Sequence, residues 1–135
     1  MKFKFIEDLT SDVMFEAYGK NEKELFENAG LALFSVICQV NKVKSVKKVK
    51  VKVKGDDLKD LMINWLQELI GLVDIKEMFF SKFKILKINE KQVEAEIYGE
   101  EIKPEKGETV VKAVSYYNFE LKKNKKWKVR VVLDI

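Results

Sequence analysis

The side chains that could do chemistry in this sequence are carboxylates, lysines and aromatic rings, because the chain has no histidine and only one cysteine, Cys38. Without histidine there can be no Ser–His or Cys–His nucleophile pair and no histidine-ligated zinc. The GxxxxGK(S/T) and GxGxxG loops that cradle phosphates are missing as well. The oxygen donors that remain suit a hard cation, or a binding surface, better than most catalysis.

Two aspartates lie at the ends of predicted strands. Asp12 immediately precedes a predicted strand over residues 13–18, and Asp134 follows one over residues 127–133, next to Ile135. An ordered strand that sets a terminal carboxylate beside an aspartate requires a cation to relieve the repulsion. The alternative is that each aspartate is a solvated carboxylate. A metal-dependent hydrolase using Asp12 and Asp134 is a further hypothesis, but the sequence offers no recognisable general base.

The densest basic tract runs from Lys42 to Lys54. Within it Val49, Val51 and Val53 alternate with lysines, and a period of two is typical of a half-buried strand. The lysine face could bind phosphates, which makes a nucleic-acid-binding module the alternative hypothesis for function. The other interpretation is a solvated strand face whose lysines discourage aggregation, because no aromatic residues interleave there to stack bases.

Two helices are predicted in the first half of the chain. Asn21 with Glu24 resembles a capping box, and Asp57 caps a second helix with Asp60 in its first turn. Apolar residues at helical spacing follow each cap and predict one buried face per helix. They are Leu25, Ala29, Leu33, Val36 and Val40 in the first helix, and Leu58, Leu61, Met62, Trp65, Leu69 and Leu72 in the second.

The other regular segments alternate apolar and polar residues, which predicts strands. They are residues 2–6, 13–18, 47–54, 82–85, 93–97, 109–116, 118–121 and 127–133, with a polar loop over residues 100–107. Two helices followed mainly by strands predict an α+β fold, with both helices packed on one face of a mostly antiparallel sheet. The length of 135 residues predicts one domain over residues 1–135.

The sequence also bears on cellular location. Residues 1–5 alternate lysine with phenylalanine and lack the apolar core of a signal peptide. No apolar run approaches the roughly 18 residues needed to cross a bilayer. A single cysteine allows no disulfide within the chain, which fits a reducing compartment. These features predict a cytoplasmic protein with no membrane partner.

Short segments spread over the whole chain resemble motifs of the archease family. Each segment is weak alone, but their order, their spacing and their coincidence with the chain end make the combined resemblance specific. The segments are residues 8–12, 16–19, 25–29, 57–58, 64–69, 112–116 and 134–135.

The resemblance implies an accessory protein, not an enzyme, that activates an RtcB-type RNA ligase in tRNA splicing and RNA repair, with tRNA as an indirect partner. Such an activator promotes guanylylation of the ligase and its multiple turnover. The family's metal ligands carry over to Asp12, Asp134 and Ile135, the last through backbone or terminal oxygens, and the metal is calcium or manganese. Lys112 and Asp8 lie in matching segments and are further candidate functional residues.

The sequence departs from the family pattern at two histidines. Leu9 stands where the family usually has the histidine of its first motif, and Tyr117 stands where it has a second. The oxygen ligands are unaffected by these changes. Any contact that the imidazoles make with metal, partner or nucleotide is absent from this chain.

Overall fold

The computed structural model describes residues 1–7 and 12–135, and in them the chain forms seven strands and two α-helices. The helices are α1 (Glu22–Ile37) and α2 (Leu58–Lys76), with short 3₁₀ helices η1 (Val40–Lys42) and η2 (Pro104–Lys106). The strands are β1 (Phe3–Ile6), β2 (Val13–Gly19), β3 (Lys47–Lys54), β4 (Met78–Ile88), β5 (Gln92–Glu101), β6 (Ala113–Lys123) and β7 (Trp127–Asp134). The predicted α+β class is confirmed.

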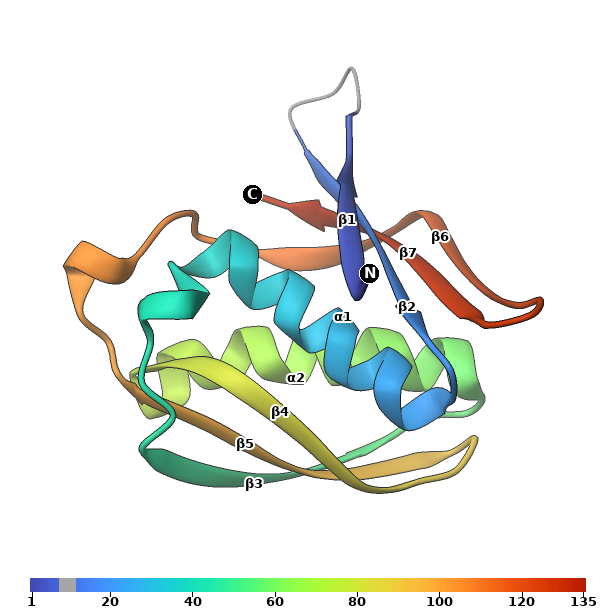
Figure 1. The fold of residues 1–135 in the computed structure, drawn as a ribbon, viewed down its shortest axis with the longest axis horizontal. Coiled ribbons are helices and arrows are strands. Elements are labelled where there is room, and N and C mark those ends of the chain that lie inside the picture. The colour runs from blue at the N-terminus through green and yellow to red at the C-terminus, as the bar shows by residue number, and fades with distance from the viewer. Residues whose placement is uncertain (8–11) are drawn as a thin grey trace.

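The strands divide between two antiparallel sheets, whereas the sequence predicts one sheet with helices on one face. One sheet has the order β1-β2-β7-β6 and the other the order β3-β5-β4. Both helices lie between the sheets, and α1 packs against β2 as well as β4 (Figure 1). The single-sheet prediction is wrong because alternation within a strand fixes its buried face but not the strands it pairs with.

α1 is buried on more sides than the one apolar face that its spacing predicts. Phe26, Ala32 and Phe34 lie outside the predicted stripe, yet they are as fully buried as Leu25 and Leu33. A helix between two sheets must present apolar surface in both directions, which widens its hydrophobic face.

The caps of both helices are as predicted, but α1 ends earlier. Asn21 Oδ1 accepts the Glu24 N–H at 2.9 Å, and Asp57 Oδ1 accepts the Asp60 N–H at 2.8 Å. Val40, predicted to continue α1, lies in η1 instead. Among the described residues, no helix is long and apolar enough to cross a membrane.

Hydrogen bonds from a distant loop complete the last turn of α1. The Glu108 N–H donates to Ile37 O at 2.9 Å, and the Thr109 N–H donates to Val36 O at 3.2 Å. Carbonyls in the last turn of a helix lack partners within the helix and require such donors. A tertiary contact therefore replaces the next helical turn.

β6 is one irregular strand where the sequence predicts two, over residues 109–116 and 118–121. Its register with β7 jumps between Ser115 and Glu120, and Asn118 has a left-handed φ of 56°. Residues 116–119 form the extra length of a bulge, and asparagine tolerates the left-handed conformation better than most residues. Residues 109–112, predicted as strand, precede β6 instead.

Glu100, in β5, is a buried carboxylate that fixes the loop after it. Its Oε2 accepts hydrogen bonds from Lys106 Nζ and from the Lys44 N–H, both at 2.7 Å, and Lys103 Nζ lies 3.1 Å from Oε1. The bond from Lys106 and then the bond from the Lys44 backbone hold the pKa of Glu100 at about 2, against a usual 4.5. Residues 102–107 are thereby tied to β5.

Glu100→Gln is expected to be less stable than the wild type at neutral pH and to lose stability less steeply in acid. Because the folded pKa lies below 4.5, the carboxylate's contribution is present above pH 4.5 and is lost as the pH falls towards about 2. Glutamine has no charge to lose in that window. Urea unfolding at neutral pH and at steps through the window measures both effects, with the exposed Glu90→Gln as control. Equal acid slopes in variant and wild type would contradict the prediction.

Candidate functional site

The four-stranded sheet brings Asp12 and Asp134 to the same end. β2 and β7 pair antiparallel, and their last paired residues are Val13 and Leu133. Asp12 and Asp134 are the residues next to that last pair, so their backbones come to the same end of the sheet, and both are half-buried. Like charges brought close together on neighbouring strands are destabilising. Two carboxylates close together favour a cation near them, which makes this end of the sheet a candidate cation site.

The segment that leads into β6 reaches the same end of the sheet. Ala113 is the register partner of Asp134, and the Lys112 N–H donates to Asp134 O at 2.8 Å. Lys112 and Ile135 are both exposed to solvent. The bond that fixes Lys112 beside Asp134 is a main-chain bond, so the structure places Lys112 at the site through its backbone.

Gln67 on α2 holds the start of β6 from the helix layer. Its side-chain oxygen accepts the N–H of Val114, the residue after the register partner of Asp134. Gln67 belongs to one of the motif segments, but nothing in the sequence around it indicates that it positions β6. A bond between a helix side chain and a strand amide is a tertiary contact that periodicity does not report.

The donors available at this end of the sheet are oxygens. Within residues 1–7 and 12–135, no group of three or more histidine, cysteine, aspartate or glutamate side chains could hold a metal. A site here would combine the carboxylates of Asp12 and Asp134 with main-chain oxygens such as those of Ile135. This donor set fits a hard ion such as calcium or manganese, with water completing the coordination, and does not fit tetrahedral zinc.

Of the remaining predicted positions, the structure describes only Tyr117. Asp8 and Leu9 fall outside the described residues. Tyr117, which stands in place of a family histidine, lies in the bulge of β6 and is 66% exposed. Its N–H donates to Ser115 Oγ at 3.1 Å.

Glu16 forms a charged cluster on the sheet face that leads to Asp12 and Asp134. It is 5% exposed, and its Oε2 accepts two hydrogen bonds from Arg130, each at 3.2 Å, while Tyr18 donates to Oε1 at 3.1 Å. Burial acts to raise the pKa of Glu16, but the bonds from Tyr18 and Arg130 outweigh it and hold that pKa below its usual value. Glu16 and Arg130 are register partners on β2 and β7.

This cluster links the two strands that carry the candidate metal ligands. Glu16 lies in the motif over residues 16–19, but no sequence pattern around it predicts its role. The available signals were an acidic residue within an otherwise apolar strand and the only arginine of the chain, Arg130. Their pairing depends on the β2–β7 register, which neither strand specifies alone.

The lysine tract lies largely on the exposed face of β3, an edge strand. Lys50 and Lys52 stand opposite Glu96 and Glu94 of β5. Lys48 Nζ lies 3.3 Å from Glu96 Oε2. These opposite charges support the interpretation of the tract as a solvated face, and nucleic-acid binding through it stays an untested prediction.

The fold and the two strand-end carboxylates define a small α+β protein with a candidate oxygen-donor site at one sheet end. The family model described as the archease protein family matches residues 3–135. The protein archease of Methanosarcina acetivorans is 40% identical over 141 residues, covering 99% of this chain and 96% of the relative. The protein archease of Sulfurisphaera tokodaii is 38% identical, covering 99% of each chain. The chain belongs to the archease family.

Solved structures show the same fold. The solution structure of Methanobacterium thermoautotrophicum protein 1598 has a TM-score of 0.84 and 34% identity, covering 99% of each chain. The crystal structure of an archease from Thermotoga maritima, described as a possible chaperone, has a TM-score of 0.65 and 19% identity, covering 96% of this chain and 95% of that one. The second likeness shows the fold alone.

Proposed function

We propose that this chain is a metal-binding, chaperone-like accessory protein that activates an RtcB-type RNA ligase and is not itself an enzyme. The observation that supports the proposal is the last β2–β7 pair, Val13 and Leu133, which brings the neighbouring Asp12 and Asp134 to the same sheet end in a chain of the archease family. In this proposal Ile135 adds backbone or terminal oxygens, and the ion is calcium or manganese. The protein acts in the cytoplasm and reaches tRNA only through the ligase.

Each residue at the sheet end has a distinct part in this proposal. Asp12 and Asp134 provide the negative charge that holds a divalent cation at the end of the sheet where the C-terminus lies (Figure 1). A bound divalent cation supplies positive charge that favours phosphate groups. Lys112, held beside Asp134 through its N–H, places a second positive charge near the same edge. The arrangement suits presenting charge to a nucleotide phosphate in a partner's active site.

The separate roles of this chain and the ligase follow from the residue types that this chain contains. The sequence has no nucleotide-cradling loop, so nucleotide binding and bond formation are assigned to the ligase. The accessory chain contributes the cation and its positioning. Gln67 and Glu16 act as positioning residues in this scheme, because they fix β6 and the β2–β7 pair that carry the ligands.

A guanylylation assay tests the proposal. The ligase is incubated with labelled GTP and manganese, with and without this chain, and the label on each protein is measured. The expected result is more guanylylated ligase when the chain is present and no label on the chain itself, with Glu90→Ala as an active control variant. An unchanged level of guanylylation, or a labelled chain, would contradict it.

Nucleic-acid binding through β3 predicts instead a steep salt dependence of RNA affinity that lysine substitutions in β3 reduce.

A further inference from the structure

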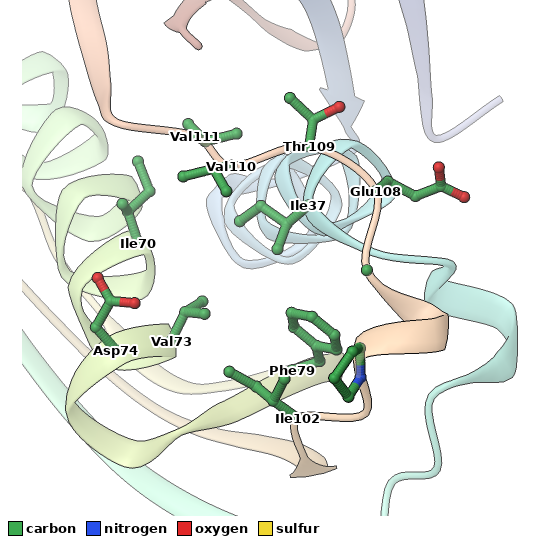
Figure 2. Close-up of a pocket in the computed structure, with 12 residues that line it drawn as sticks. Ile37, Ile70, Val73, Asp74, Phe79, Ile102, Glu108, Thr109, Val110 and Val111 are labelled. Atoms are coloured by element: carbon green, nitrogen blue, oxygen red, sulfur yellow. The ribbon is translucent and has the colours of Figure 1, made fainter.

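An apolar cavity lies on the side of the molecule formed by the ends of both helices. It has a volume of about 390 Å³ and is enclosed by the C-terminal parts of α1 and α2 and by residues 102–111 (Figure 2). Ile37 of α1, Ile70 and Val73 of α2, and Phe79 of β4 form much of its apolar lining. We call it the α1–α2 groove. Its size and lining are those of a site that binds an apolar group.

Apolar side chains extend the groove onto the open surface. Val110 is 82% exposed and Ile102 is 37% exposed, and both line the groove whose deeper wall includes Phe79 and Val111, each 7% exposed. A small ligand inside the cavity would leave the outer side chains in water. A chain segment lying across the opening would cover Val110 and Ile102 as well as fill the cavity, so the shape favours a segment.

The loop wall of the groove is fixed by hydrogen bonds before anything binds. Residues 108 and 109 bond to the last carbonyls of α1, and the Gly107 N–H donates to Pro104 O at 3.0 Å. Glu100 holds Lys103 and Lys106 of the same loop by ion pairs of 3.1 and 2.7 Å. Binding to this preformed wall costs little ordering entropy.

The two charged residues that line the groove are acidic, although the whole chain has a net charge of +4. Asp74 on α2 and Glu108 on the loop lie on either side of the groove (Figure 2). The neighbouring lysines Lys103 and Lys106 are held by Glu100. Neither Asp74 nor Glu108 forms an ion pair within the described part of the chain. The Glu108 carboxylate points away from the groove in Figure 2, so the Asp74 carboxylate is the one that favours a positively charged residue on whatever occupies the groove.

We propose that the α1–α2 groove binds a short segment of a partner protein that inserts an aliphatic side chain and carries a lysine or arginine beside it. The aliphatic side chain packs against Val73 and Phe79, and the basic residue pairs with Asp74. The groove shares residues 109–111 with the segment that leads to Lys112 and the sheet end. A partner held in the groove therefore lies beside the candidate metal site, but the binding needs no metal.

Binding of labelled peptides to the metal-free protein tests this proposal. The probe is a capped, fluorescent peptide with the core Lys-Leu-Ile-Lys, and the comparison peptides have the cores Glu-Leu-Ile-Glu and Lys-Ser-Ser-Lys. The wild type is expected to bind the basic aliphatic probe in preference to both others. Amide NMR signals of Val73, Phe79 and Val110 are expected to shift on binding, which locates the probe in the groove.

Two matched pairs of variants make the test specific. Val110→Asp is expected to weaken binding of the probe about tenfold, because that is the size of the affinity loss when one buried aliphatic contact is removed. Asp74→Lys is expected to weaken binding of the probe several-fold. Val46, which is 70% exposed and is not among the residues that line the groove, provides the control Val46→Asp, and Glu90→Lys provides the charge control. Both controls are expected to bind like the wild type.

Three outcomes would overturn the proposal. The first is no preference for the basic aliphatic probe, and the second is equal loss of binding in the control variants. The third is a wild-type dimer that Val110→Asp converts to a monomer in sedimentation, which would assign the groove to a second copy of the chain. None of these readouts uses the ligase or a metal, so failure here is distinct from failure of the proposed function.

Discussion

Asp134→Ala is expected to reduce the affinity for calcium or manganese about 100-fold, and Asp12→Ala is expected to do the same. Removing one of two carboxylates halves the acidic side-chain charge at the sheet end, which costs on the order of 3 kcal/mol of binding free energy. Both residues are half-buried at strand ends outside the core, so the fold should remain intact. Isothermal calorimetry measures the affinities, with circular dichroism as the check on folding.

The metal-free proteins provide a second readout of the same site. Without a cation, two carboxylates at one sheet end repel each other, so Asp134→Ala should be at least as stable as the wild type under chelating conditions. Adding calcium or manganese should then raise the melting temperature of the wild type but not that of the variant. Asp74→Ala, an exposed aspartate elsewhere, is the control. Unchanged affinity in both the Asp12 and Asp134 variants would mean that the shared site does not exist.

Trp65→Ala is expected to cost about 3–5 kcal/mol of unfolding free energy, the largest stability effect of any single side chain discussed. Trp65 is 0% exposed on α2, and its Nε1–H donates to the carbonyl of Phe26 on α1 at 3.1 Å. Truncation opens a cavity between the helices and also leaves that carbonyl without its partner.

Trp65→Phe separates the two contributions. The smaller ring keeps much of the packing but cannot donate to the Phe26 carbonyl, which predicts a loss of about 1–3 kcal/mol. Trp127→Ala is the matched control, because Trp127 is half-buried at the start of β7 and should cost less. Urea unfolding of the variants gives the free energies. A cost for Trp65→Ala no greater than that for Trp127→Ala would contradict the assignment of Trp65 to the core.

Local features of the fold could be predicted from the sequence. The cap residues Asn21 and Asp57 predict where the two helices begin, because their side-chain oxygens accept hydrogen bonds from free N–H groups at a helix start. The alternation through β3 also predicts its boundaries and its exposed lysine face. In each case the signal lies within a few residues of the feature.

Features that depend on distant contacts could not be predicted. The end of α1 at Ile37 depends on donors from residues 108 and 109, and the division into two sheets depends on strand partners. The bulge in β6 could have been suspected from Asn118, but its length is set by the register with β7.

The candidate site was partly predictable for the same reason. Asp12 and Asp134 stand out as carboxylates at strand ends, and the structure brings them to the same end of the sheet. The supporting residues Gln67 and Glu16 did not stand out, because their partners come from other elements of the fold. Sequence patterns therefore identify candidate ligands more readily than the residues that position them.

The central claim is tested most directly by counting ligations in a multiple-turnover assay with limiting RtcB-type ligase. The wild-type chain is expected to raise the number of RNA joins per ligase molecule while joining no ends alone. Asp12→Ala and Asp134→Ala should give little stimulation, Lys112→Ala should give less than wild type, and the control Glu90→Ala should match it. If both aspartate variants stimulate the ligase as well as the wild type does, activation through a metal held at the sheet end is contradicted.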